Sequence, residues 1–245
     1  MLPTAPCTYL DWDSDFFGVR IARVNASRLS EETVAPILAW CAEQAIDCLY
    51  FLADSNDYET SRLAAQNAFH LVDLRVSLDR SLANGLLNGG NGNGSVIRPC
   101  EAADLPALKA IARAVHCDTR FYFDPRFPRD RCDALYETWI EKSCGGYADL
   151  VLVADQHGAA VGYCSCHRRG SEGQIGLFGV HADYHGQGVG SKLIREALRW
   201  FVDQGLERAS VVTQGRNIAA QRLYQKHGFM TQAVQLWYHR WFTAR

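Results

Sequence analysis

The sequence lacks the features that mark membrane proteins and proteins that bind nucleic acids. Its 25 basic residues are balanced by 27 acidic ones, which leaves no excess positive charge for a polyphosphate backbone or an anionic membrane surface. No apolar run approaches the ~18 residues of a membrane-spanning helix. The start, Met1 to Cys7, also lacks a basic segment followed by an apolar one, so we expect a cytoplasmic protein with neither nucleic acid nor membrane as a partner.

The sequence also lacks paired cysteines. It contains nine cysteines, but an odd number without C-x-x-C spacing is not typical of disulfides or of a zinc site. Cys164, Cys166 and His167 form the densest group of metal-ligating residue types. Alternation along a strand would place His167 on the face opposite the two cysteines, so we expect no bound metal and reduced, mostly buried thiols.

A segment rich in glycine and asparagine, residues 84–95, is typical of a flexible linker. It divides the chain into residues 1–83 and a longer part, residues 96–245. In the longer part, hydrophobic patterns predict the order βα(α)βββαβαβ. Its clearest element is an amphipathic helix starting near Val189 and ending before Gly205.

The shorter part repeats one pattern of the longer part. A strand at 48–52, a helix at 56–67 and a strand from Phe69 parallel a strand at 210–213, a helix at 217–227 and a strand from Phe229. In both, an Arg-Leu pair precedes the phenylalanine at the same spacing. We interpret residues 1–83 as carrying a degenerate half-copy of the later unit.

The strongest chemical motif is the turn His185-Gly186-Gln187-Gly188-Val189-Gly190-Ser191, between a predicted strand and the amphipathic helix. Glycines let backbone N–H groups approach a pyrophosphate, and the positive end of the helix adds to the attraction. The spacing is not the G-x-G-x-x-G of a dinucleotide-binding domain, nor that of a P-loop.

This turn, the preceding strand 175–180 and the later segment 217–229 together resemble the GNAT acetyltransferases. The resemblance implies an α/β (α+β) fold with a central mixed, mostly antiparallel sheet flanked by helices, and a truncated GNAT-like N-terminal lobe. It implies acetyl-CoA as the acetyl donor. The family's usual Arg or Gln at the start of the turn is replaced by His185, which leaves the backbone cradle but changes one side-chain contact.

The resemblance also assigns site residues. It implies that the backbone of Phe178, Gly179 and Val180 binds the pantetheine arm, that Asn217 and Ala220 contact it from the later helix, and that Tyr224 faces the same ligand. For Asn217 the alternative is a helix N-cap, and for Tyr224 a core position. The pyrophosphate would be held by the turn, that is, by His185, Gly186, Gln187, Gly188, Val189, Gly190 and Ser191.

Further segments resemble the acetyltransferases that act on TDP-linked amino-deoxy sugars such as TDP-fucosamine. They include residues 12–19, 69–73, 119–121 and 139–141. A nucleotide sugar requires a cation for its diphosphate and aromatic faces for its base and sugar. We therefore expect an acceptor site that includes Phe17, Arg120, Phe121 and Tyr122, although these aromatics would equally suit packing between lobes.

The expected reaction is direct attack of a neutral primary amine on the thioester, with the oxyanion held by a strand N–H near Phe178. We expect Tyr224 to protonate the departing thiolate, and the resemblance implies Asp73 as the base. Three alternatives remain open: another small amine, a peptide N-terminus, or a catalytically silent acyl-CoA-binding protein. A homodimer is compatible with the sequence.

Overall fold

The computed structural model describes residues 5–83 and 94–242, and its contacts divide the chain into two compact units. Unit 1 contains Met1–Arg75, Thr119–Arg131 and Val234–Arg245, whereas unit 2 contains Val76–Asp118 and Cys132–Ala233. The expected linker at 84–95 lies, up to residue 93, outside the described residues. All nine cysteines are free and most are buried, as predicted.

Unit 1 is a small sheet with helices. Its strands follow the order β1-β2-β3-β10, with β2 parallel to β3 and the other two pairs antiparallel. Strands β4 and β10 have residues in both units. The elements are β1 (Cys7–Tyr9), α1 (Asp11–Phe17), β2 (Ile21–Val24), α2 (Glu31–Glu43), β3 (Cys48–Asp54), α3 (Tyr58–Gln66), β4 (His70–Ser81), α5 (Arg120–Phe123) and β10 (Met230–Trp241).

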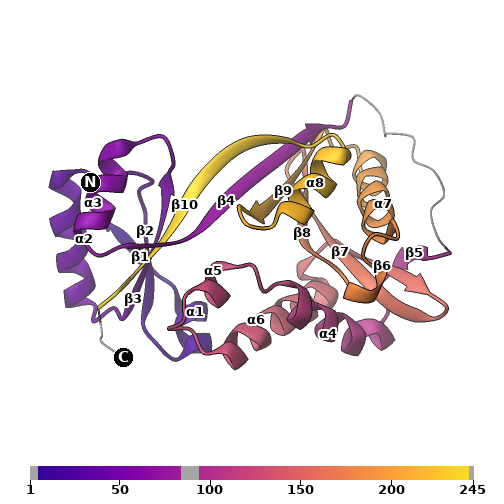
Figure 1. The fold of residues 1–245 in the computed structure, drawn as a ribbon, viewed down its shortest axis with the longest axis horizontal. Coiled ribbons are helices and arrows are strands. Elements are labelled where there is room, and N and C mark those ends of the chain that lie inside the picture. The colour runs from indigo at the N-terminus through magenta and orange to yellow at the C-terminus, as the bar shows by residue number, and fades with distance from the viewer. Residues whose placement is uncertain (1–4, 84–93, 243–245) are drawn as a thin grey trace. The chain divides into compact units, whose positions relative to one another are not determined.

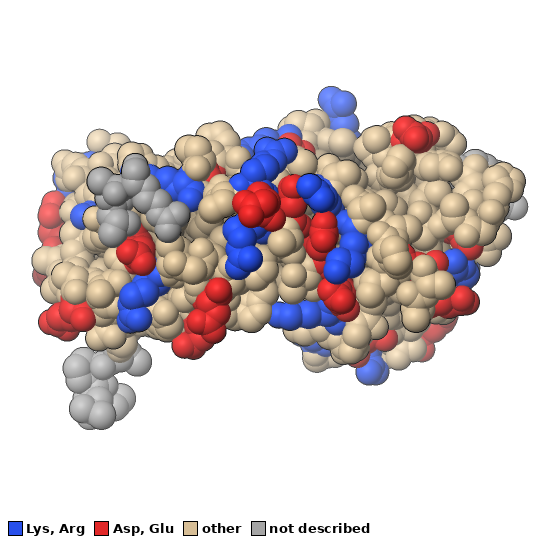
Figure 2. All heavy atoms as spheres, turned by 90° about the horizontal axis from the view of Figure 1, so that it is seen from below, with Lys and Arg blue, Asp and Glu red and all other residues tan. Residues whose placement is uncertain are grey.

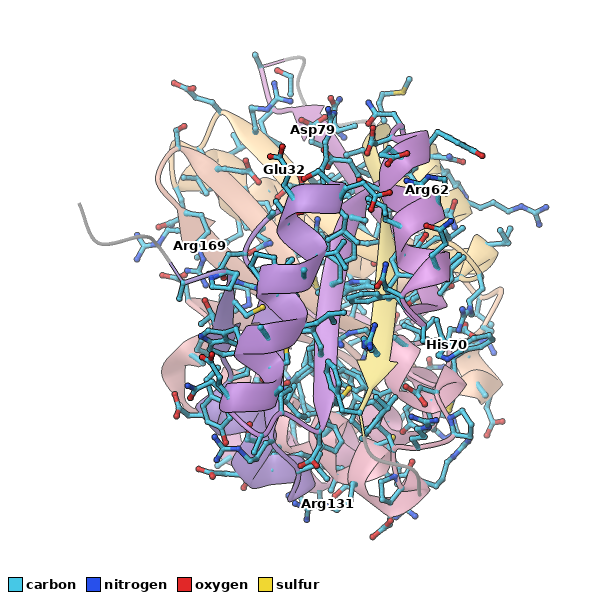
Figure 3. The ribbon with its side chains drawn as sticks, turned by 90° about the vertical axis from the view of Figure 1, so that its left-hand side faces the viewer. Glu32, Arg62, His70, Asp79, Arg131 and Arg169 are labelled. Atoms are coloured by element: carbon cyan, nitrogen blue, oxygen red, sulfur yellow. The ribbon has the colours of Figure 1, made fainter. Side chains whose placement is uncertain are left out.

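Helices α2 and α3 lie next to each other in front of the strands of unit 1 (Figure 3). Ile37 and Cys41 of α2 and Leu63 of α3 share a buried cluster with Leu49 and Phe51 of β3. The guanidinium of Arg62 on α3 pairs with Glu31 of α2 at 2.6 Å. The strand alternation of β3 thus directs one set of side chains towards these two helices.

Unit 2 contains the longer run of strands, in the order β4-β9-β8-β7-β6-β5 (Figure 1). The pairs β5–β6, β6–β7 and β7–β8 are antiparallel, while β8 and β9 are parallel. Its elements are β5 (Val96–Pro99), η1 (Ala102–Asp104), α4 (Leu105–Val115), α6 (Arg129–Lys142), η2 (Ser143–Tyr147), β6 (Leu150–Gln156), β7 (Ala159–Arg169), β8 (Glu172–Val180), η3 (Ala182–Tyr184), α7 (Val189–Asp203), β9 (Arg208–Gln214) and α8 (Ile218–Lys226).

The predicted order of elements is confirmed for the later part of the chain, and the closing segment is one long strand, β10. The structure adds the short helix α5 at residues 120–123 and the short helical segments η1, η2 and η3. No helix of residues 5–83 and 94–242 is both long and apolar enough to cross a bilayer.

The repeat predicted in residues 48–72 is present in the structure. The units β3-α3-β4 and β9-α8-β10 have the same element order, and both helices begin at a side-chain cap. The Asp57 carboxylate accepts a bond from the Thr60 N–H at 2.9 Å, and the Asn217 side chain accepts one from the Ala220 N–H at 3.0 Å. The half-copy predicted in residues 1–83 therefore has the element order of the later unit, and its description as a separate N-terminal lobe stays a prediction.

Strand β7 has two different faces because successive side chains alternate. Cys164 and Cys166 belong to the core cluster that includes Leu193 and Ala197 of α7. Ser165 and His167 instead line a cavity on the α6 side. The prediction that His167 faces away from the two cysteines is therefore confirmed.

Strands β8 and β9 part midway along their length. Their pairs run from Glu172–Arg208 to Ile175–Val211, whereas β8 continues to Val180 and β9 to Gln214. The pairing of β7 with β8 also shifts register between Cys164 and Cys166, so two residues of β8, Gly176 and Leu177, face the single residue Ser165. A bulge of this kind bends a strand and re-aims its backbone groups.

The charged side chains of the surface are mixed in sign. On the face drawn in Figure 2, basic and acidic side chains lie next to each other. In unit 2, for example, Arg98 pairs with both Asp104 and Asp155, and Arg113 pairs with Asp133.

Gly173 of β8 offers a test of how tightly α7 packs on the sheet. A Cβ atom there would lie 2.5 Å from ring atoms of Phe201, which is itself fully buried. Because the ring has no room to retreat, Gly173→Ala should lower the free energy of unfolding by about 1–3 kcal/mol. Denaturant unfolding measures the loss.

Gly145→Ala is the matched control, because a Cβ atom at Gly145 meets nothing within 4 Å and needs no positive φ. Equal stability of the two variants would contradict the packing assigned to Phe201.

Candidate active site

The turn between β8 and α7 provides a cradle of backbone groups. Gly186 and Gly188 have φ values of 73° and 83°, which residues with a Cβ atom rarely adopt. A Cβ atom at either position would meet no protein atom within 4 Å, so the space in front of this backbone is open to a ligand. The turn therefore fits a bulky anion held by backbone N–H groups.

Helix α7 presents its N-terminus to this turn. Gly188 is the N-cap, and the first turn of the helix carries no acidic side chain. The Gly188 carbonyl accepts a bond from the Lys192 N–H at 3.1 Å, so the amides of Val189, Gly190 and Ser191 precede the first intrahelical bond. The helix dipole adds positive potential at this end.

The side chains of the turn stabilise its shape. The His185 ring Nε2 lies 2.8 Å from the Val180 carbonyl oxygen, and the Gln187 side chain donates to the Asp183 carbonyl at 2.7 Å. His185 thus fixes the end of β8 to the turn, and its contact with the ligand stays a prediction.

Helix α8 approaches the same strand. The ring of Tyr224 is buried and lies 6.1 Å from the ring of Phe178, edge to face. A Cβ atom on Gly190 would lie 3.1 Å from Leu223 and 3.4 Å from Phe178. Strand β8, helix α7 and helix α8 therefore meet around the predicted donor-binding residues, including Gly179, Val180, Asn217 and Ala220 of these same elements.

Two of these residues combine a structural role with the predicted one. Asn217 caps α8, so the N-cap alternative holds, whatever ligand it also contacts. Burial raises the pKa of the Tyr224 phenol, and the nearby Cys164 acts in the same direction. The phenol therefore stays protonated throughout the neutral range.

The predicted acceptor residues Phe17, Arg120, Phe121 and Tyr122 lie in unit 1. The guanidinium of Arg120 lies over the rings of Tyr50, Phe121 and Trp237, within 4.1–4.3 Å of their centroids. It also lies 2.9 Å from Nε2 of His239. Phe17 stacks on Phe121 at 5.4 Å, and Arg129 lies over the Tyr122 ring.

His239 extends this cluster into the interior of unit 1. Its Nδ1 lies 2.7 Å from the Asp124 carboxylate, which also accepts a bond from the Trp241 indole N–H at 2.9 Å. Burial lowers the pKa of His239 to about 4, so its ring is neutral and Nδ1–H donates to Asp124. The cluster gives Arg120 a defined place, and its binding of an acceptor stays a prediction.

Asp73 lies on the β4 segment of unit 1 and is buried. Its carboxylate accepts a bond from the Leu74 N–H at 2.8 Å. Its role as a base stays a prediction.

Two residues that were not predicted as site residues, Ser165 and His167, line a cavity where β8 leaves β9. The signal that could have identified them is the alternation of β7, which directs them away from the cysteines. The described residues contain no group of three or more metal-ligating side chains arranged around one point.

Residues 109–229 match the acetyltransferase (GNAT) family. A GCN5-related N-acetyltransferase from Sphaerobacter thermophilus superposes with a TM-score of 0.71 over 97% of this chain and 76% of its own, at 14% identity. A tandem GNAT protein from the clavulanic acid biosynthesis pathway gives a TM-score of 0.63 over 93% of this chain. The chain has the GNAT fold.

Two named relatives have a higher sequence identity than these structures, over a smaller part of the chain. The spore coat polysaccharide biosynthesis protein SpsD of Bacillus subtilis is 27% identical over 58% of this chain and 50% of its own length. A mycothiol acetyltransferase of Clavibacter sepedonicus is 25% identical over 86% of this chain and 65% of its own. The chain thus spans about half to two thirds of the length of these relatives.

The turn before α7 allows a test with an internal control. Gly188→Ala adds a Cβ atom to the cradle in a residue with positive φ, and Gly205→Ala adds one at the other end of α7, where φ is 72° and the space is equally open. Both should cost about 1–3 kcal/mol of stability through backbone strain. Only Gly188→Ala should weaken CoA binding, by at least about tenfold, in titration calorimetry. Equal CoA affinities for the two folded variants would remove the cradle from the binding site.

Proposed function

We propose that this protein transfers an acetyl group from acetyl-CoA to the primary amine of a nucleotide-linked amino-deoxy sugar. The observation that carries the transferase activity is the meeting of three elements where β8 and β9 part. There the open turn before α7, the end of β8 that pairs with β7 but no longer with β9, and the buried phenol of Tyr224 belong to one unit.

Acetyl-CoA, when bound, supplies an activated thioester. The backbone of Gln187 to Ser191 would hold its pyrophosphate, and the backbone of β8 from Phe178 to Val180 would hold its pantetheine arm. A strand has free N–H and C=O groups only where it has no partner strand, and β8 continues beyond its last pair with β9. This part of β8 therefore suits a ligand with amide groups.

Tyr224 is suited to act as a general acid. The burial that raises the pKa of its phenol keeps the proton in place at neutral pH, and collapse of the tetrahedral intermediate expels a thiolate that requires a proton. The ring is held against Phe178 and Phe229, so that its position is defined before the substrates bind.

The acceptor class rests on the name of one relative and on the side chains around Arg120. The relative from Bacillus subtilis has a name that refers to polysaccharide biosynthesis. The segment around Arg120 joins a cation to aromatic rings in the way that a nucleotide diphosphate requires. Asp73 is the base implied by the resemblance to sugar acetyltransferases.

An acceptor panel tests the class directly. Acetyl-CoA is incubated with TDP-linked amino sugars, small amines and peptides with free N-termini, and thiol release is measured for each. Preference for a TDP-amino sugar supports the proposal. Turnover with only the other amines overturns the acceptor class, and CoA binding without turnover on any amine overturns the transferase.

Replacing Tyr224 tests the acid. Tyr224→Phe keeps the ring but removes the proton, so kcat should fall about 10²- to 10⁴-fold, with little change in CoA affinity. Tyr238→Phe, a buried tyrosine of unit 1 that stacks on Phe51, is the control for loss of a buried hydroxyl. Near-normal kcat in Tyr224→Phe would exclude it as the acid.

Replacing Arg120 tests the acceptor segment. A charge-assisted bond to a diphosphate contributes about 1.5–3 kcal/mol, so Arg120→Ala should raise the KM for the nucleotide sugar about ten- to hundredfold and leave the KM for acetyl-CoA unchanged. Arg20→Ala, which removes another arginine stacked on an aromatic ring of unit 1, is the control. Equal effects of Arg120→Ala on both KM values would argue against this segment as the acceptor site.

A further inference from the structure

A cavity of about 540 Å³ opens in unit 2 beside the point where β8 and β9 part. Gly176 and Leu177 of β8 and Val212 of β9 line it, and these residues directly follow the last pair, Ile175–Val211. The next residue of β8 is Phe178, near which the oxyanion of the reaction is expected. The cavity therefore lies beside the proposed reaction centre.

His167 of β7 is a titratable side chain that lies against β8 in this cavity. A Cβ atom built on Gly176 would lie 2.6 Å from His167 Nε2 and 2.6 Å from Ser165 Oγ. Both polar atoms therefore lie directly over the Gly176 backbone, which only a glycine allows. The Ser165 hydroxyl is held there because it accepts a bond from the Leu177 N–H at 2.7 Å.

The side-chain contacts of His167 are long. Nε2 lies 3.5 Å from Ser165 Oγ, and Nδ1 lies 3.4 Å from a guanidinium nitrogen of Arg169. A hydrogen bond of ordinary length is about 2.9 Å, so an incoming donor can make a stronger bond to the ring than either of these two side chains does. The ring also has a hydrogen bond to the Tyr147 backbone.

The lining of the cavity is cationic. Lys142 and Arg169 line it, and no acidic side chain does so among the residues described. Positive neighbours lower the pKa of a bound amine, which favours the neutral, nucleophilic form. They also attract an acceptor that carries an anionic group, such as a phosphate.

We propose that this cavity receives the acceptor amine and that His167 takes the amine's proton as the general base. The inference rests on the proposed transferase function. The amine nitrogen forms a bond to the thioester carbon and gives a proton to His167, the C–S bond breaks, and the thiolate takes a proton from Tyr224. The imidazolium then releases its proton to water and the phenolate regains one, so that protons balance over the cycle.

The surroundings of His167 keep its ring neutral at neutral pH. Burial and the charge of Arg169 lower its pKa, and the Asp149 carboxylate and a bond to the Tyr147 backbone oppose them without reversing the shift. Lys142, at the end of α6, adds a further positive charge to the cavity, and β8 and β9 contribute no titratable side chain to the described lining. The ring therefore takes up a proton at a lower pH than an ordinary histidine does.

The pH dependence of kcat tests the assignment, using the full chain, acetyl-CoA and the best amine of the acceptor panel. The kcat of the unmodified protein should be constant down to about pH 6.5 and fall below it. His167→Gln should lower kcat about 10²- to 10⁴-fold at pH 7. The fall of kcat at acidic pH, which is the acidic limb of the profile, should move to higher pH in this variant, towards the pKa of the free amine. An unchanged profile in the folded variant overturns the inference.

His227→Gln is the matched control, because His227 is also buried in unit 2 and burial lowers its pKa to about 4. It should keep the profile of the unmodified protein. The pH profile of kcat in Asp73→Asn separates the two candidate bases. If the acidic limb moves to higher pH in Asp73→Asn and not in His167→Gln, the role of His167 is overturned.

Chemical rescue separates catalysis from structure. In His167→Ala, added imidazole should restore part of the lost kcat, and it should restore nothing in His227→Ala. His167 has only a structural role if imidazole does not restore kcat in His167→Ala and the acidic limb does not move in His167→Gln. That pair of results overturns the inference. If the unmodified protein acetylates none of the amines, the proposed transferase function is overturned. If it acetylates an amine and His167→Gln has the same kcat and pH profile, only the role of His167 as the base is overturned.

Discussion

The separation of β8 from β9 beyond the Ile175–Val211 pair is the constraint on which the rest of unit 2 depends. Backbone groups of a strand need partners, and here a register shift in β7–β8 and the departure of β9 leave the end of β8 without a second neighbouring strand. The same departure makes room for the turn before α7 on one side and for the His167 cavity on another. Donor and acceptor can therefore approach one strand from two directions.

Much of this arrangement follows from sequence. The spacing of glycines in the turn, the amphipathic pattern of α7 and the repeat between residues 48–72 and 210–229 predicted elements that the structure contains. These features are local, since each depends on φ preferences or on side-chain periodicity within a few turns. The same holds for the opposite faces of Cys166 and His167.

What the sequence could not predict depends on pairing between distant residues. The bulge at Gly176 arises from the register of β8 against β7, and no local pattern indicates where such a shift falls. Arg120 illustrates the other limit: its residue type suits a diphosphate, but its contacts with Tyr50, Trp237 and His239 come from strands far away in the chain.

The two repeated units differ at a position that matters for chemistry. In β9-α8-β10 the Phe229 N–H donates to the Tyr224 carbonyl at 3.1 Å, and in β3-α3-β4 the Phe69 N–H donates to the Ala64 carbonyl at 2.9 Å. Ala64 thus occupies the place of Tyr224, with the same backbone geometry but no phenol. The N-terminal copy preserves the scaffold and has lost the proposed acid.

In unit 1 a strand from early in the sequence, β3, pairs with the late strand β10, and this pairing affects how the protein folds during synthesis. The strand next to β3 in unit 1 is the C-terminal half of β10, and the Ser55 hydroxyl donates to the Val234 carbonyl across 179 residues of sequence. During synthesis, the first strands emerge long before their partner exists, and contacts of such long range form slowly. The sheet of unit 1 thus stays incomplete, with an open edge beside β3, until residues 235–241 have left the ribosome.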